Sequence, residues 1–264
     1  MAYSVSMKQG ILLAAFGSGS RQGDSALQLF DAEVRARFPG LAVRWAFTSL
    51  RMRERLAMER KKTDSVRKAL EKMAFERYSH VAVQPLQCIP GREYGDVLED
   101  ARALSRERNI VVRVGTPLLH SDDDVAAAAA ALLRHLPAER GKDEAVVWVG
   151  HGARHPATAR YDALARAVRR LDPLVHVGTM SDASALPRIL EELRARRNRH
   201  VWLLPLLSVI GRHALDDLAG SEAPSWKSRL EAAGVACTPV LKGSAEYPGF
   251  IQIWLDHLEL ALID

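Results

Sequence analysis

Three side chains that can ligate a metal ion each follow a predicted strand: Glu93, His151 and His213. Gly150 and Gly152 flank His151, which forces a turn there and leaves the imidazole accessible. Two imidazoles and a carboxylate suit a borderline divalent ion such as cobalt, iron, nickel or zinc, whereas a structural zinc site would take four ligands. An imidazole with a pKa of about 6.5 could also remove a proton from a substrate nitrogen. The pattern indicates a site for a divalent ion, although each histidine alone could simply cap a loop.

An internal repeat relates two of these residues. The segment VAVQPLQCIPGREYGDVL, from Val81, aligns with VWLLPLLSVIGRHALDDL, from Val201, at a constant offset of 120 residues. A Gly-Arg pair follows the strand in both segments, and Glu93 falls on His213. Two similar halves that face each other would direct the ends of their strands into one shared cleft.

Short apolar runs alternate with stretches of helical spacing, which predicts parallel strands joined by right-handed crossovers. We predict strands at residues 11–16, 41–47, 81–86, 110–114, 145–149, 175–179, 201–206 and 236–241. We predict helices at residues 24–38, 51–75, 94–106, 122–136, 156–171, 186–197, 226–233 and 250–262.

The polar segment 137–143 is the one convincing linker in this pattern. The predicted fold is therefore α/β, with two similar halves at residues 1–136 and 144–264, each a parallel sheet flanked by helices, and an active-site cleft between them. In this prediction the closing helix, at residues 250–262, can pack back on the first half.

Hydroxyl and arginine side chains occupy the same predicted loops. The loop Gly17-Ser18-Gly19-Ser20 lacks the GxGxxG and GxxxxGK[ST] patterns, so no nucleotide is expected, but its hydroxyl and N–H groups could hold a carboxylate. Arginine forks also pair well with carboxylates. The predicted substrate-binding residues are Ser18, Ser20, Thr48, Ser49, Arg92, Arg154 and Arg212.

The composition is that of a soluble globular enzyme, with 48% hydrophobic and 26% charged residues. The net charge of +5 is spread over helical stretches without interleaved aromatic residues, which favours a small polyanionic substrate over nucleic acid. No apolar run approaches membrane-spanning length, and the run at 11–16 is shorter than a signal-peptide core. Two cysteines, Cys88 and Cys237, suit a reducing compartment. We expect a cytoplasmic protein with no nucleic-acid or membrane partner.

Seven short motifs cover nearly the whole chain: LLAAFGS from Leu12, RWAFTS from Arg44, VAVQPLQCIPGREY from Val81, GTPLL from Gly115, VGHGARH from Val149, LPLLSVIGRHALDD from Leu204 and SWKSRLEAAGVACTP from Ser225. In this order and spacing they resemble the anaerobic, ATP-independent sirohydrochlorin cobaltochelatases, which are class II tetrapyrrole chelatases.

The resemblance implies a chelatase fold with the active site between two halves, and a homo-oligomer. It implies that His151 takes a pyrrole proton and faces the metal, while His213 and Glu93 hold the ion before transfer. It also implies Co2+ as the substrate metal, no nucleotide, and sirohydrochlorin or its precorrin-2 form, a polycarboxylate, as the partner of the cleft arginines.

One position departs from the family pattern. Many relatives have an acidic residue followed by an aromatic residue and proline where this chain has Ser181-Asp182-Ala183, and Asp182 is a candidate substitute. Because of this departure, the identity of the inserted metal stays open, and Fe2+ insertion for sirohaem is the alternative. Two rivals come from other classes: a tetrapyrrole or metal carrier without turnover, and a phosphate-handling enzyme built on the serine-glycine loop.

Overall fold

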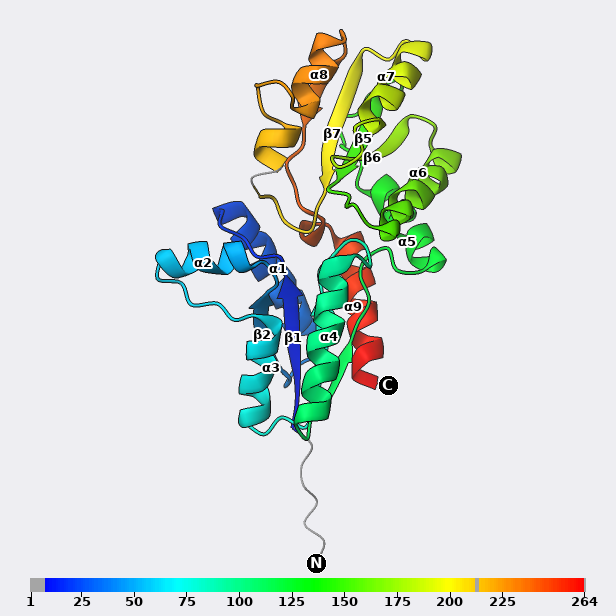
Figure 1. Cartoon of the computed structure of the whole chain (residues 1–264). Helices are drawn as coiled ribbons and strands as arrows, with labels where there is room; N and C mark the ends of the chain where they lie inside the picture. Colours follow the sequence, from blue (N-terminus) through cyan, green and yellow to red (C-terminus); the bar gives the residue numbers. More distant parts are fainter. Residues whose placement is uncertain (1–7, 212–213, 264) are drawn as a thin grey trace, which may run out of the picture.

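The computed structural model describes residues 8–211 and 214–263, which form two parallel sheets of four strands each (Figure 1). The first sheet has the order β2-β1-β3-β4 and consists of β1 (Gln9–Ala15), β2 (Ala42–Phe47), β3 (His80–Pro85) and β4 (Val111–Val114). The second has the order β6-β5-β7-β8 and consists of β5 (Ala145–Gly150), β6 (Val175–Thr179), β7 (His200–Leu206) and β8 (Ala236–Pro239). The two sheets have the same topology, as the internal repeat predicts.

Both central strands are buried on their two faces, which explains their continuous apolar sequences. The helices that flank the sheets are α1 (Arg21–Arg37), α2 (Leu50–Met58), α3 (Val66–Phe75), α4 (Arg92–Glu107), α5 (Asp122–Arg134), α6 (Ala159–Leu171), α7 (Ala185–Ala195), α8 (Trp226–Ala232) and α9 (Pro248–Ile263). In the part of the chain that the structure describes, none of the helices is both long and apolar enough to cross a membrane. Two parallel sheets of the same topology, each flanked by helices, confirm the predicted α/β fold of two similar halves.

The carboxyl ends of the two sheets face each other (Figure 1). The hydroxyl of Ser20, which follows β1, donates to the carbonyl of Ile210, which follows β7, at 3.0 Å. The thiol of Cys88, which follows β3, lies 3.6 Å from the carbonyl of Leu206 at the end of β7. The loops predicted to carry the site thus meet between the halves.

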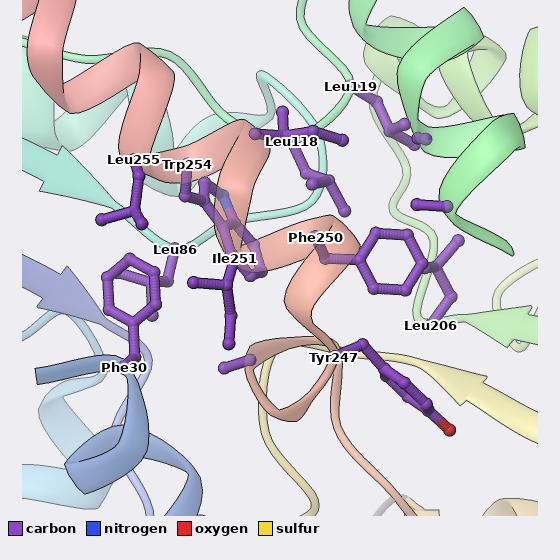
Figure 2. Close-up of a cluster of buried hydrophobic side chains, with 14 of the residues drawn as sticks. Phe30, Leu86, Leu118, Leu119, Leu206, Tyr247, Phe250, Ile251, Trp254 and Leu255 are labelled. Atoms are coloured by element: carbon purple, nitrogen blue, oxygen red, sulfur yellow. The ribbon is translucent and has the colours of Figure 1, made fainter. Parts of the chain in front are cut away.

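Helix α9 contacts both halves, although it ends the chain. It packs along β3 and β4 of the first sheet. Its Trp254 lies edge-on to Phe30 of α1, with ring centroids 5.9 Å apart, and its Phe250 lies edge-on to Trp148 of β5 at 6.0 Å. Figure 2 shows this aromatic and aliphatic cluster, which belongs to one core shared by the two halves.

The prediction of a single helix at residues 51–75 was wrong, because the chain breaks between α2 and α3. Arg60 adopts a left-handed backbone conformation with φ of 60°, which a continuing helix cannot contain. Asp64 then accepts a backbone hydrogen bond from the end of β2, at Phe47, and the hydroxyl of Ser65 caps α3. The Thr-Asp-Ser sequence at 63–65 is the signal for this new helix start.

Buried His176 on β6 makes the stability of the second half sensitive to acid. Its Nδ1 lies 3.2 Å from Glu192 of α7. Burial lowers its pKa to about 4; Glu192 raises it, Arg169 and Arg196 lower it, and Asp172 raises it. Because this folded-state pKa lies below the unfolded value of about 6.5, the unfolded chain binds the proton first, and stability is lost as pH falls from 6.5 towards 4.

We expect His176→Leu to lose less stability than the parent between pH 6.5 and pH 4, by about 1 kcal/mol for each pH unit. Urea unfolding at a series of pH values measures the difference in slope. His120→Gln, at an exposed histidine, is the control and keeps the parent slope. Equal slopes for the parent and His176→Leu would contradict this assignment.

Candidate metal and tetrapyrrole site

Glu93 lies in the first turn of α4, directly beyond the end of β3, and is half-buried. Burial raises the pKa of its carboxyl, Gln87 and His151 lower it, and Asp96 raises it. A carboxylate that has lost part of its water shell interacts more strongly with a cation than an exposed one does. This environment suits a group that holds a divalent ion for a short time.

His151 is exposed and follows Gly150, the last residue of β5. Its Nδ1 lies 2.8 Å from the carbonyl oxygen of Gly152. Since a carbonyl only accepts, Nδ1 carries a hydrogen, and this bond orients the imidazole ring. The role of His151 in metal or proton transfer stays a prediction.

A tight turn fixes the backbone at His151. Gly152 has φ of 71°, and a Cβ there would lie 2.0 Å from the Ser181 hydroxyl oxygen. The Ser181 N–H donates to the carbonyl of His151 at 3.0 Å. Glycine is thus required after His151, and Ser181 occupies the position where relatives carry an acidic residue.

Glu93 and His151 come from different halves, and the structure brings them within electrostatic range, since His151 lowers the pKa of the Glu93 carboxyl. His213 and Arg212, the other predicted residues of this centre, lie outside the described residues. Within residues 8–211 and 214–263, no three His, Cys, Asp or Glu side chains are grouped closely enough to hold an ion. The three-ligand set stays a prediction.

The four predicted hydroxyls all make bonds inside the protein. The Ser18 hydroxyl accepts from the N–H of Ser20 at 3.1 Å, and the Ser20 hydroxyl caps α1 while donating to Ile210. The Thr48 hydroxyl donates to a β1 carbonyl at 3.3 Å, and the Ser49 hydroxyl caps α2. These residues shape the loops at the sheet edge, and their contact with substrate stays a prediction.

Arg92 at the start of α4 and Arg154 beyond the His151 turn are both exposed. Asp182, the candidate substitute for the missing acidic residue, is held at the start of α7. Its carboxylate accepts from the N–H and hydroxyl of Ser184 at 2.9 and 2.7 Å and from Arg188 at 2.8 Å. These bonds and the Arg188 charge lower its pKa, so Asp182 serves the helix end.

Gln87 is a site residue that the sequence patterns did not single out. It lies next to Cys88, and its side chain lowers the pKa of the Glu93 carboxyl. Both amide atoms of Gln87 are buried and have no hydrogen-bond partner of ordinary length among the described residues. The only sequence signal of Gln87 is its position just after a strand.

Two α/β halves whose sheets face each other at their carboxyl ends are also found in solved chelatases. The sirohydrochlorin chelatase SirB from Bacillus subtilis subspecies spizizenii in complex with cobalt has a similar fold, with a TM-score of 0.64 over 97% of this chain and 95% of that one. The two sequences are 18% identical, so this similarity concerns the fold alone.

Comparison with protein families identifies the particular chelatase. The model of the family described as cobalt chelatase (CbiK) matches residues 9–263. A sirohydrochlorin cobaltochelatase, CbiKC, from Nitratidesulfovibrio vulgaris is 61% identical over 97% of this chain and 91% of its own length. The sirohydrochlorin cobaltochelatase from Salmonella typhimurium is 31% identical, over 97% of each chain. The chain belongs to the cobalt chelatase (CbiK) family.

Proposed function

We propose that this chain is a chelatase that inserts Co2+ into sirohydrochlorin, as a step of cobalamin synthesis, without a nucleotide. The observation that carries the proposal is the 61% identity, over 97% of the chain, to an enzyme named for this reaction. The electrostatic effect of His151 on the Glu93 carboxyl, which belongs to the other half, supports it further. The metal is a substrate of the reaction.

The proposed chemistry replaces two pyrrole N–H protons with one divalent ion. His151 accepts one pyrrole proton at Nε2, because Nδ1 is engaged as a donor to the Gly152 carbonyl, and the second proton leaves to water. Glu93 and His213 hold Co2+ until the ring nitrogens replace them as ligands. The partial burial of Glu93 removes competing water from the ion.

The proposed contacts to the substrate periphery are electrostatic. Arg92 and Arg154 are exposed and can turn their guanidinium groups towards carboxylates, and Arg212 joins them in the proposal. The hydroxyls and N–H groups around Ser18, Ser20, Thr48 and Ser49 complete the carboxylate contacts. These loops contact a ring that lies between the halves, near His151 and Glu93.

We further propose a cytoplasmic location, a homo-oligomeric state, and no nucleic-acid or membrane partner. Cys88 and Cys237 are free thiols, which supports a reducing compartment. In this proposal the net charge of +5 attracts a polycarboxylate substrate.

The test is a side-by-side insertion assay with Co2+ and Fe2+ under anaerobic conditions without ATP. We expect many turnovers with Co2+, at a higher rate than with Fe2+, followed by the absorbance change of sirohydrochlorin on metal insertion. Faster insertion of Fe2+ would instead assign the chain to sirohaem synthesis. One-to-one binding without turnover would make it a carrier, and dependence on added ATP would contradict the nucleotide-free reaction.

A further inference from the structure

A partly buried thiol, that of Cys88, lies where the two halves meet. The thiol of Cys88 donates to the carbonyl of Leu206 at 3.6 Å. Its sulfur also interacts with the hydroxyl of Tyr161 and with the backbone N–H of Ser208, and both interactions lower its pKa. Burial outweighs them and raises the pKa of Cys88 to about 12, so the group is a neutral thiol in the cell. Cys88 is therefore a hydrogen-bonding group rather than a nucleophile.

Tyr161 connects this thiol to the strand that carries His151. Its side chain is 4% exposed and lies directly over Gly150. A Cβ on Gly150 would lie 2.4 Å from Cε1 of the Tyr161 ring and 2.9 Å from its hydroxyl oxygen. The phenol thus sets the position of the last residue of β5, immediately before His151.

Two further hydrogen bonds hold the Cys88 segment itself. The N–H groups of Leu118 and Leu119 donate to the carbonyls of Gln87 and Cys88, at 3.1 and 2.8 Å. Cys88 is five residues before Glu93, on the segment that leads into α4. A displacement of Cys88 would therefore be transmitted to Glu93 and to Gln87.

The contact between Cys88 and Ser208 joins equivalent positions of the internal repeat. Cys88 and Ser208 occupy equivalent positions at the offset of 120 residues, and they touch each other. Each is five residues before a predicted metal ligand, Glu93 in one half and His213 in the other. The two equivalent loops therefore meet at Cys88 and Ser208.

We infer that Cys88 and Tyr161 are positioning residues, which set the separation of Glu93 and His151 across the two halves through their shared hydrogen bonds. The inference rests on the proposed function. Most of the core shared by the halves is apolar, and the hydrophobic effect is not directional. Two halves joined by that core alone could shift slightly relative to each other. Directional bonds at the meeting point remove that freedom, and small displacements of catalytic groups cost much rate.

The test uses Tyr161→Phe, which deletes only the hydroxyl, and Cys88→Val, which replaces the thiol with a methyl group and adds a second one, with Cys88→Ser as the rescue. Cys237→Val, at the other free cysteine, on β8, is the matched control. We expect the KM for Co2+ to rise about tenfold in Cys88→Val and Tyr161→Phe, with a smaller change in kcat and no loss of folded protein. Cys88→Ser recovers most of the loss, and Cys237→Val matches the parent.

Hydrogen exchange supplies a readout that needs no activity. We expect faster exchange at the N–H of Gly95 in the first turns of α4 and at the N–H of Ser181, which bonds His151, in Cys88→Val and Tyr161→Phe only. Unchanged exchange or unchanged KM in both variants would overturn the inference. A parent protein that inserts no metal would overturn the proposed function instead, and the exchange data would still decide the positioning role.

Discussion

The variant His151→Ala is expected to lose at least about a hundredfold in the rate of cobalt insertion while it remains folded. The side chain is exposed and follows the end of β5, so its removal leaves no cavity in the core. What it removes is the imidazole that we propose to take the pyrrole proton, whose ring the hydrogen bond to Gly152 orients. The measurement is the initial rate of sirohydrochlorin metallation, with circular dichroism and thermal unfolding as the check on folding.

The matched control is His155→Asn, four residues further along the same loop. His155 is also exposed, and its ring accepts from the N–H of Ala157 at the start of the short helix Pro156–Thr158, a capping role that asparagine can fill. We expect this variant to insert cobalt at the parent rate. A folded His151→Ala protein with the parent rate would eliminate the proposed role of His151.

The parts of the fold that the sequence predicts are those where one local pattern dominates. The apolar run before Gly150 and the equivalent run before Phe16 predict the two central strands because a parallel strand buries both faces. The break at Arg60 escaped the prediction because the charged residues on either side all favour a helix, and only Thr63, Asp64 and Ser65 signal the stop and restart.

The candidate site divides in the same way. Glu93 and His151 could be predicted as site residues because each lies in a loop or helix start that follows a strand, and their roles stay predictions. Gln87 was missed because an amide without charge carries no signal until its burial is known. The signal of Ser20 and Ser49 is ambiguous, since a serine after a strand is typical both of ligand contact and of a helix cap. In the structure both hydroxyls cap helices.

Helix α9 could be predicted as a helix, with packing on the first half as one option, but the sequence could not name its neighbours, because tertiary packing selects them. Apolar side chains cover most of its circumference, which indicates a helix buried on several sides. His257 adds specific contacts, to the carbonyl of Thr116 and to Asp124 of α5, each at 2.9 Å. The last helix of the chain therefore attaches to segments from the first half of the sequence.

This position makes Trp254→Ala the substitution with the largest expected cost in stability, about 3–5 kcal/mol in the free energy of unfolding. Trp254 is fully buried and packs edge-on against Phe30 (Figure 2). Its Nε1 makes no hydrogen bond to a described residue, so Trp254→Phe loses only volume and should cost about 1–2 kcal/mol. Leu260→Ala, on the same helix but 60% exposed, should stay within about 0.5 kcal/mol of the parent. Urea unfolding of the three variants measures this order, and a cost for Trp254→Ala no larger than that for Leu260→Ala would show that α9 does not hold the halves together.

Because the shared core joins the half that carries Glu93 to the half that carries His151, Trp254→Ala should also reduce cobalt insertion at temperatures where it is still folded.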